Sequence, residues 1–524
     1  MEPTGGATIS EGFPLEQMCE QSLSRDPAQQ AIEYKGTWSR WGQLRAVANL
    51  LRALLEESGL SGSAPVVFVP RNRPSAAAAF LGMLAQARTV RMAYAFQAPG
   101  ALAGELESLA PAVMVADAVD FSPEVCSTLR AHGAVGIALT EMNAKLVAGL
   151  ERARRSQPSG PPSPPQIEIL TSGTTGAPKR FALAYDMVAR HIVGGNKNYR
   201  ALAEDYSRRP PAFLYYPLAN ISGIYTVLPT LLLGHSMMLV ERFSVDAWRD
   251  HIRRYRPERA SLPPAGVQMV LDAGVPPEEL AGVRSIATGA APLEPSVQRT
   301  FEARYKIPVL QSYGATEFGG PVTSMTLELH AEWGERKFGS VGRPLAGARL
   351  RVVDADTGET LPPGQEGVLE VLVPRMGPDW LRTSDFAVLD GDGFLFHKGR
   401  ADGAIIRGGF KLLPETIERA LIEHPCVSGA LVVGLPDVRL GQVPAALVAI
   451  RRGAPRPTPA DLEQHLRDRL YATHVPVAWH FVDDLPRTPS LKADRAAARR
   501  AFERDAGGNL SPAMTAEGTP EPTT

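Results

Sequence analysis

Nine consecutive residues combine three kinds of group that suit a polyphosphate. The stretch reads Thr171-Ser172-Gly173-Thr174-Thr175-Gly176-Ala177-Pro178-Lys179. Hydroxyl groups can hydrogen-bond phosphate oxygens, glycines let backbone N–H groups approach an anion, and the lysine adds a charge-assisted hydrogen bond. The stretch is not a Walker A loop, because two residues separate the second glycine from the lysine. A Ser/Thr/Gly run alone is more often a solvated linker, so the hypothesis depends on the rest of the chain.

Residues 311–317 place several useful groups close together. They read Gln311-Ser312-Tyr313-Gly314-Ala315-Thr316-Glu317. An aromatic ring can stack on a nucleobase, and a carboxylate is a hard oxygen ligand of the kind that Mg²⁺ prefers. The structural alternative is a loop with an exposed acid, and the residue types alone leave both interpretations open.

Three further segments toward the C-terminus carry charged groups. Residues 382–385, Arg-Thr-Ser-Asp, end in Asp385, which a turn or a helix cap would equally explain. Residues 399–411 hold glycines beside charged side chains, as a simple hairpin would. Lys492 follows a Pro/Ser/Thr-rich stretch and would by default be one more solvated lysine.

Hydrophobic periodicity predicts alternating strands and helices in the N-terminal half. An apolar run at 64–69 predicts a buried strand between helices at 36–57 and 75–87. A short strand at 167–170 leads into the phosphate-binding candidate, and strand ends are where α/β proteins usually bind ligands. We therefore predict an α/β fold with helices on both faces of a largely parallel sheet.

The pattern changes after about residue 345 to short β-like runs separated by turn residues. We predict an N-terminal domain of residues 1–400, in which 345–400 form a β-rich subdomain. A small α+β domain is predicted at 401–504. The last stretch, 505–524, is rich in Gly, Pro and Thr and is predicted to be disordered.

Composition argues against several functional classes. The net charge of −1 does not favour nucleic acid as a partner. No apolar run approaches the roughly 18 residues of a membrane span, and no secretory signal is recognisable. The three cysteines, Cys19, Cys126 and Cys426, have neither metal-ligand spacing nor a disulfide pattern. We expect no zinc site and a cytoplasmic location.

Taken in order, the motifs resemble the adenylate-forming superfamily of acyl-CoA synthetases, nonribosomal adenylation domains and luciferases. They are the Ser/Thr/Gly loop, Tyr-Gly-x-Thr-Glu at 313–317, Asp385, Gly-Arg-x-Asp at 399–402 and Lys492. The resemblance extends from about residue 15 to about residue 500. It implies a large domain of stacked mixed and parallel sheets with flanking helices, and a small mobile C-terminal domain. It also implies ATP-dependent conversion of a carboxylic acid to acyl-AMP with release of pyrophosphate, and then acyl transfer to a thiol.

The resemblance assigns ATP binding and catalysis to specific positions. In catalysis, Thr316 would hydrogen-bond the α-phosphate and Glu317 would bind Mg²⁺. Lys492 would bridge the attacking carboxylate and the ribose oxygens. Within the ATP site, Tyr313 would stack on adenine and Asp385 would accept hydrogen bonds from both ribose hydroxyls. The residues assigned to ATP are Thr171, Ser172, Gly173, Thr174, Thr175, Gly176, Lys179, Tyr313, Gly314, Asp385 and Arg400.

The resemblance also bears on the thiol acceptor. The C-terminal domain would rotate about the hinge residue Asp402, and Gly408 and Gly409 would line a tunnel for the pantetheine thiol of CoA. The segment 407–418 looks more like that of CoA ligases than of amino-acid adenylation domains. We favour CoA, with a carrier-protein thiol as the alternative. An alternative of another class is a non-catalytic protein that binds ATP or AMP.

Small residues dominate the positions expected to bind the acid. They indicate a roomy cavity for a bulky, aryl or fatty acid, or they simply allow close backbone packing. Three positions depart from the family pattern: Asn220 replaces a common histidine, Ser384 stands where glycine is common, and Leu491 replaces the usual glycine before Lys492. The sequence does not identify the acid or distinguish a monomer from a homodimer. The expected acid pocket comprises Asn220, Gly223, Gly289, Ala290, Ala291, Gly319 and Gly320.

Overall fold

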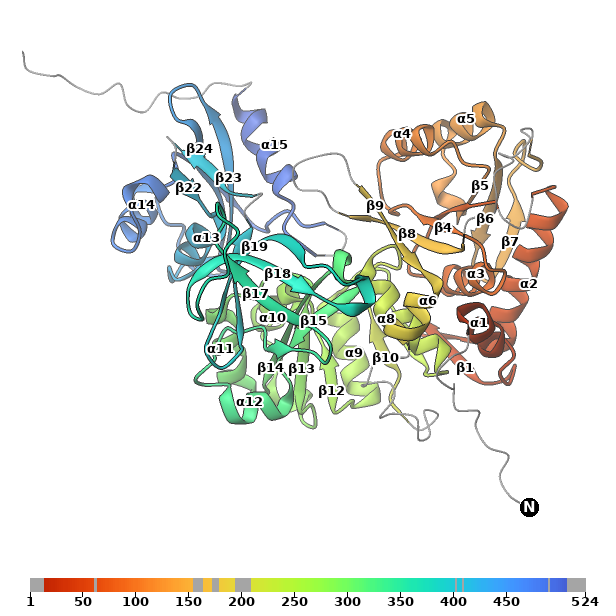
Figure 1. Cartoon of the computed structure of the whole chain (residues 1–524), viewed down its shortest axis with the longest axis horizontal. Coiled ribbons are helices and arrows are strands. Elements are labelled where there is room, and N and C mark those ends of the chain that lie inside the picture. Colours follow the sequence, from red (N-terminus) through yellow and green to blue (C-terminus); the bar gives the residue numbers. More distant parts are fainter. Residues whose placement is uncertain are drawn as a thin grey trace, which may run out of the picture. The chain divides into compact units, whose positions relative to one another are not determined.

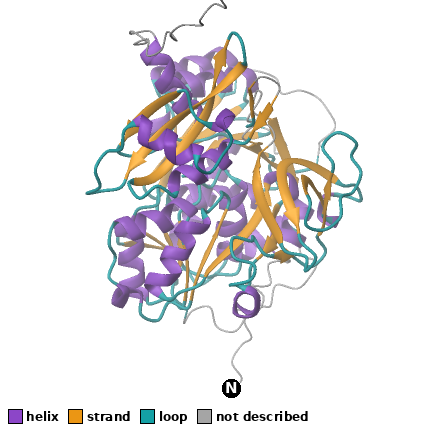
Figure 2. Ribbon diagram, turned by 90° about the vertical axis from the view of Figure 1, so that its left-hand side faces the viewer, coloured by secondary structure: helices purple, strands orange, loops and turns teal. Residues whose placement is uncertain are grey.

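A computed structural model describes most of the chain, in two compact units. The units are residues 1–397 and 398–524. Strands and helices are intermixed in the molecule (Figure 2), in agreement with the predicted α/β class. The described residues are 14–60, 64–153, 164–171, 179–193, 209–400, 403–407, 410–488 and 491–506.

The first part of the larger unit is built on a seven-stranded sheet. Its central strands β6, β5, β3, β4 and β8 run parallel, and an antiparallel strand flanks each edge. The strand order is β7 (Asn143–Leu146), β6 (Val135–Thr140), β5 (Val113–Asp117), β3 (Val66–Val69), β4 (Val90–Met92), β8 (Gln166–Thr171) and β9 (Lys179–Ala184).

Helices pack beside this sheet because their apolar positions repeat at helical spacing. Nearly every residue of the alanine-rich α3 is buried, and a Cβ on Gly82 would lie 2.9 Å from that of Ala48 on α2, so the two helices are in close contact. Helices α4 and α5 lie side by side (Figure 1). The helices are α1 (Leu15–Leu23), α2 (Trp41–Glu57), α3 (Pro74–Ala85), α4 (Pro99–Leu109), η1 (Ala118–Asp120) and α5 (Pro123–His132).

The helix predicted at 36–57 is wrong at its start. Residues Thr37–Arg40 form strand β2, and α2 begins only at Trp41. Lys35 and Gly36 both have positive φ, so the chain reverses there and β2 pairs antiparallel with β1. The apolar residues from Trp41 onward repeat at helical spacing, and this strong pattern led to the whole segment being predicted as helix.

A second, four-stranded sheet contains that hairpin and two parallel strands from later in the chain. Ile32 of β1 pairs with Met237 of β11. The order is β10 (Ala212–Leu214), β11 (Met237–Leu239), β1 (Gln30–Tyr34) and β2 (Thr37–Arg40). The neighbouring helical elements are α6 (Tyr185–Met187), the π-helix η2 (Val188–Val193) and α8 (Ile221–Leu232).

A third sheet carries the 311–317 motif. Strands β12 to β14 are parallel, and β15 and β16 add antiparallel pairs. The strands are β12 (Arg259–Ser261), β13 (Ser285–Gly289), β14 (Val309–Ala315), β15 (Gly320–Ser324) and β16 (Arg343–Pro344). The helical elements are α9 (Val245–Tyr255), α10 (Pro264–Asp272), η4 (Pro277–Leu280), α11 (Pro295–Tyr305), η5 (Thr316–Phe318) and α12 (Leu327–Trp333).

The region after residue 345 forms a fourth sheet of four strands, at the positions where β-like runs were predicted. Its apolar residues, such as Leu369 and Val371, pack in one cluster with Phe318 and Val322 of the third-sheet region. The elements are β17 (Arg349–Val353), β18 (Glu366–Leu372), η6 (Pro374–Met376), β19 (Leu381–Leu389) and β20 (Leu395–Arg400).

The smaller unit has its own sheet and its own apolar clusters. One cluster contains Ile417 and Val448, and the other contains Leu447 and Phe502. The strands are β21 (Ile405–Arg407), β22 (Phe410–Leu412), β23 (Val427–Asp437), β24 (Gly441–Ile450) and β25 (Ala478–Val482). The helical elements are α13 (Pro414–Ile422), α14 (Pro459–Arg467), η7 (Ala472–His474) and α15 (Arg495–Ala506). The predicted disordered tail lies outside the described residues from residue 507 onward.

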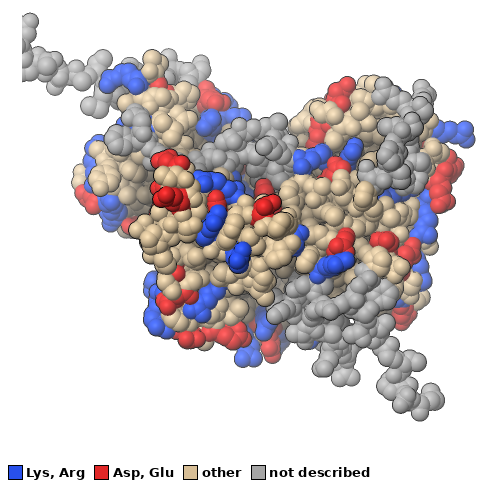
Figure 3. Space-filling view, viewed as in Figure 1, with Lys and Arg blue, Asp and Glu red and all other residues tan. Residues whose placement is uncertain are grey.

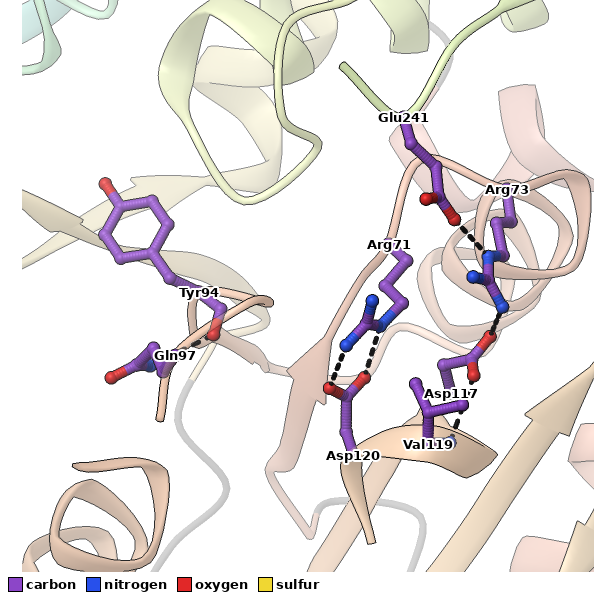
Figure 4. A network of polar contacts seen from close by, with 8 residues as sticks. All are labelled: Arg71, Arg73, Tyr94, Gln97, Asp117, Val119, Asp120 and Glu241. Carbon is purple, nitrogen blue, oxygen red and sulfur yellow. Dashed lines mark hydrogen bonds and ion pairs between the residues drawn. The ribbon is translucent and has the colours of Figure 1, made fainter. Parts of the chain in front are cut away.

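Charge in the larger unit is organised into ion pairs at strand ends. Arg73 lies between Glu241, which follows β11, and Asp117 at the end of β5, and so links two sheets (Figure 4). Beside it, Arg71 forms a bidentate pair with Asp120. On the face drawn in Figure 3, positive and negative side chains of the described residues are interspersed, as the net charge of −1 would suggest.

Candidate active site

The described ends of the phosphate-binding candidate belong to a β-hairpin. Thr171 ends β8 and pairs with Lys179, which begins β9. Residues 172–178, predicted to bind phosphate, lie outside the described residues. The strand that leads into them is fixed by the Tyr94 hydroxyl, which donates to the Leu170 carbonyl at 3.2 Å. Burial raises the pKa of Tyr94 to about 12, so this donor keeps its proton at neutral pH.

Two of the predicted nucleotide-binding residues contact each other. The Tyr313 hydroxyl on β14 donates to Oδ2 of Asp385 on β19, across 72 residues of sequence. The Asp385 side chain is 9% exposed, and its backbone N–H donates to the Thr383 hydroxyl oxygen at 3.0 Å. Thr383 in turn donates to the Leu369 carbonyl of β18. The turn or cap considered for Asp385 is wrong, because the residue lies within a strand.

His397 completes this group from the neighbouring strand β20. Its Nε2 lies 3.3 Å from Oδ1 of Asp385, and its ring centroid lies 6.0 Å from that of Tyr313. A neutral imidazole N–H in this position donates a hydrogen bond to the carboxylate. The arrangement therefore combines an aromatic face with a buried, oriented carboxylate, which suits recognition of a base and its sugar.

The residues predicted to act at phosphorus follow directly on β14. Thr316 and Glu317 form the single turn η5, which ends at Gly319 with φ +66°. Glu317 is exposed, and no hydrogen bond or ion pair joins its carboxylate to other described residues. A free, hard oxygen ligand at this position fits a Mg²⁺ ion held together with substrate phosphates.

The small residues of the expected acid pocket are closely packed. A Cβ on Gly223 would lie 2.1 Å from the Pro217 carbonyl oxygen, and one on Gly289 would lie 2.5 Å from Oγ of Ser312. A Cβ on Gly320 would lie 2.9 Å from the Tyr225 ring of α8. Of the two interpretations of these glycines, close backbone packing agrees with the contacts at these three positions.

Two buried oxygens in this region have no partner among the described residues. They are Oδ1 of Asn220, the residue before α8, and Oγ1 of Thr288, next to Gly289 on β13. The neighbouring Ala290 has φ +68°, a conformation unusual for a residue with a side chain. A buried, unsatisfied polar oxygen is costly, so a ligand that hydrogen-bonds it would be favoured.

Lys492 lies in a short turn of the smaller unit. The Thr488 N–H donates to the Lys492 carbonyl at 2.8 Å, and the Lys492 N–H donates to the Thr488 hydroxyl oxygen at 3.2 Å. The Lys492 side chain is exposed. Leu491 before it has φ +60°, the left-handed conformation that glycine adopts without strain. The chain thus adopts, at Leu491, the backbone conformation that is typical of glycine.

A buried ionic cluster anchors the chain just after this turn. Arg495, at the start of α15, donates to Glu418 at 2.6 Å and to Glu415 at 2.9 Å. Gly399 comes close to the same cluster, because a Cβ there would lie 2.8 Å from Oε2 of Glu415. Arg400 follows Gly399 on β20. The hinge candidate Asp402 and the tunnel candidates Gly408 and Gly409 lie outside the described residues.

Comparison with known proteins agrees with this arrangement. The profile described as AMP-binding enzyme matches residues 19–377, and the profile of the AMP-binding enzyme C-terminal domain matches residues 416–492. This chain belongs to the AMP-binding enzyme family. It is therefore a member of the adenylate-forming superfamily and an AMP-forming acid–thiol ligase.

The relatives of this AMP-binding enzyme differ in their acids and acceptors. A sulfoacetate–CoA ligase of Cupriavidus necator is 35% identical over 363 residues, 65% of this chain and 68% of that protein. The fatty acid–[acyl-carrier-protein] ligase ScoC of Streptomyces coeruleorubidus is 29% identical over 367 residues, 67% and 70% of the two chains. The ATP-bound structure of MatB from Rhodopseudomonas palustris shares the fold, with TM-score 0.75 and 23% identity over 93% and 99% of the two chains.

Two residues that the structure brings to the candidate site of this AMP-binding enzyme were not predicted from the sequence. His397 was not among the predicted site residues, although its place one strand from Asp385 was a usable signal once β19 and β20 were recognised as neighbours. Arg375, on η6, had no signal in the sequence. Its Nε donates to the Phe318 carbonyl at 2.5 Å, and its Nη2 donates to the Pro321 carbonyl at 2.9 Å, so the side chain spans Gly319 and Gly320.

No helix among the described residues is both long enough and apolar enough to cross a lipid bilayer. The three cysteines are free thiols, with Cys19 and Cys126 buried and Cys426 partly buried. Burial raises the pKa of Cys19 well above its ordinary value, so this thiol stays protonated and inert.

Proposed function

We propose that this protein is an ATP-dependent acyl-CoA synthetase that forms acyl-AMP and pyrophosphate and then transfers the acyl group to CoA. The observation that carries the proposal is the contact between Tyr313 and Asp385. Two segments that the sequence marked separately for base and ribose converge on one buried carboxylate. Family membership supports the reaction class.

In the first half-reaction, the formation of acyl-AMP, each of the proposed site residues has a different role. Asp385 accepts hydrogen bonds from the ribose hydroxyls, while His397 keeps its carboxylate oriented. Thr316 hydrogen-bonds the α-phosphate, and Glu317 provides the oxygen ligand for Mg²⁺, which when bound neutralises phosphate charge. Lys492 stabilises the negative charge that accumulates as the acid carboxylate attacks the α-phosphorus. No general base is required, because the acid is already ionised near neutral pH.

The second half-reaction uses the other predicted residues. Rotation about Asp402 withdraws Lys492 and brings the Gly408–Gly409 segment to the acyl-adenylate, where the thiol attacks. Such alternation between half-reactions is a known form of conformational gating. The Arg495 cluster supports this role, because it anchors the chain three residues after Lys492.

CoA is the favoured acceptor, and a carrier-protein thiol is the alternative. The sulfoacetate–CoA ligase is the more similar of the two relatives, at 35% identity against 29%. The segment 407–418 supports the same choice. We further propose that the reaction takes place in the cytoplasm, because three free cysteines fit a reducing compartment.

The test is acid-dependent exchange of pyrophosphate into ATP, followed by mass detection of the thioester. Aryl, fatty and short sulfonated or dicarboxylic acids are each assayed with CoA, with a phosphopantetheinylated carrier protein, and with neither. Exchange with at least one acid, and thioester with CoA, is the expected result. Thioester only with the carrier protein would select the alternative acceptor. Absence of exchange with every acid, despite ATP binding, would contradict the proposed reaction.

A further inference from the structure

Among the described residues, Arg375 has no acidic partner, and it lies at the edge of the expected acid pocket. Some partly buried arginines of the larger unit are paired with carboxylates, as Arg71 is with Asp120 and Arg180 with Glu105, whereas Arg25, like Arg375, hydrogen-bonds a backbone carbonyl. Arg375 binds only two backbone carbonyls, and no carboxylate of the described residues lies within ion-pair distance. Desolvation lowers the pKa of Arg375, which is the expected effect of burial on an uncompensated cation.

The free donors of Arg375 are available to a ligand. A guanidinium has five N–H groups, and the two carbonyls use one on Nε and one on Nη2. The remaining three, two of them on Nη1, have no hydrogen-bond partner among the described residues. The guanidinium therefore hydrogen-bonds the backbone through one edge. Its second edge can bind an oxyanion in bidentate fashion.

Tyr225 supplies a second donor beside it. Its ring packs on Gly320, and Arg375 spans Gly319 and Gly320 through its two carbonyl contacts. The Tyr225 hydroxyl is within electrostatic range of Arg375, and no hydrogen bond joins this hydroxyl to other described residues. His191 at the π-helix η2 is also within electrostatic range of the guanidinium.

The rest of the local wall is apolar. A Cβ on Gly319 would lie 3.4 Å from Sδ of Met187 and 3.5 Å from Sδ of Met376. Helix α8 contacts both η2 and β15, and η5 contacts η6, so these residues belong to one continuous region of the larger unit. In such surroundings an ion pair with a ligand is weakly screened, and a neutral ligand would leave the cation uncompensated.

We propose that Arg375, assisted by the Tyr225 hydroxyl, binds a second anionic group of the acid substrate. The substrate is then a dianionic acid, with one carboxylate that is activated and a remote sulfonate or carboxylate that Arg375 holds. This inference rests on the proposed acyl-activating function and narrows its substrate class. It makes Arg375 a specificity-determining residue with no part in the chemistry at phosphorus.

The test compares acids that have the same shape and differ in charge. Sulfoacetate is paired with methylsulfonylacetate, and malonate and succinate with their monomethyl esters, in pyrophosphate exchange. We expect the wild-type protein to have the higher kcat/KM for the dianion of at least one pair. In R375Q, kcat/KM for that dianion should fall about tenfold to a hundredfold, as for a lost charge-assisted hydrogen bond. Its neutral isostere should change by less than about threefold.

Two further variants test the assignment itself. Y225F should lower the preference for the dianion by a smaller factor than R375Q, because it removes one neutral donor. R336Q, which removes an exposed arginine, should leave the preference unchanged. Equal losses for dianion and isostere in R375Q would mean that Arg375 only clamps the backbone, and would overturn the inference. A wild-type preference for neutral acids would also overturn it while leaving the synthetase function intact, whereas no exchange with any acid would reject the function itself.

Discussion

The residues of the larger unit proposed to bind the nucleotide and the Lys492 turn of the smaller unit are held in different ways. Asp385 lies within strand β19, nearly buried, and contacts His397 on the neighbouring strand β20 and Tyr313 on β14 of the third sheet. Lys492 lies on a turn in which its backbone exchanges hydrogen bonds with Thr488, and its side chain is exposed. Sheets thus orient the groups proposed to recognise ATP, whereas the proposed catalytic cation lies on a turn of the smaller unit.

This difference agrees with the different duties proposed for the two regions. A binding carboxylate serves throughout the cycle and benefits from preorganisation. A lysine needed only for adenylation benefits from being easily withdrawn. The four predictions below test this division, from the largest expected effect to the smallest.

Removing the Lys492 ammonium should have the largest effect and should affect one half-reaction. We expect K492A to lower pyrophosphate exchange by about a hundredfold or more, as for loss of a group that stabilises transition-state charge. Thioester formation from supplied acyl-AMP and CoA should stay within about threefold of wild type. R499A, which removes an exposed arginine from the following helix α15, is the control. Equal loss of both half-reactions would reject the assigned role.

Locking the hinge should affect the opposite half-reaction. Proline fixes φ near −65°, so D402P should retain exchange within about threefold while thioester formation falls by about tenfold or more. D402A, which removes the carboxylate and leaves φ free, should retain both activities. Full overall turnover in D402P would contradict the rotation proposed here.

Removing the His397 contact should weaken ATP binding without slowing the chemistry. One hydrogen bond is worth about 1 kcal/mol, so H397L should raise the KM for ATP about fivefold with kcat nearly unchanged. H397Q, which restores an N–H donor, should recover part of the loss. H330L removes a comparable His–carboxylate pair, 3.3 Å from His330 Nε2 to Glu302 Oε1, and should leave the KM unchanged. A lower kcat with constant KM would indicate a different role for His397.

Relieving strain before the lysine should have the smallest effect. The left-handed conformation costs a non-glycine residue roughly 1–2 kcal/mol, and replacing leucine by glycine removes this cost. Part of the resulting stabilisation is lost, because glycine has greater conformational entropy in the unfolded chain. We expect L491G to raise the free energy of unfolding of the smaller unit by about 1 kcal/mol or less in urea titration, with exchange within about twofold. Lys306 of the larger unit has a similar φ of +57°. The control variant K306G should change the free energy of unfolding of the larger unit and leave that of the smaller unit unchanged. A lower free energy of unfolding in L491G would show that packing of the Leu491 side chain stabilises the smaller unit by more than the backbone strain costs.

Much of the fold was predictable, because the controlling signals are local. The apolar run at 66–69 and the helical spacing from Trp41 to Leu55 each identify an element without reference to the rest of the chain. The strand at 37–40 was missed because its four residues carry a weaker pattern than the helix that follows. Its formation depends on pairing with β1 and on the turn at Lys35 and Gly36.

The candidate site was predictable where a motif carries both residue type and spacing, as at Tyr313 and Asp385. The contact between them is tertiary, since 72 residues separate them, and no local pattern encodes it. The same holds for Arg375, whose role depends on backbone carbonyls of Phe318 and Pro321 far away in the sequence. The glycines left two interpretations open for a related reason, because a missing side chain indicates free space or close contact equally well until the neighbours are known.

The apolar clusters that contain Leu369, Ile417 and Leu447 each lie wholly on one side of residue 397. Residues that share one apolar core unfold together. Heating should therefore unfold the protein in two separable transitions, so that a single midpoint temperature is not well defined. In calorimetry, a ligand that binds only the larger unit should raise one transition and leave the other in place. A melting curve can therefore report which unit a substrate, or a substitution, has acted upon.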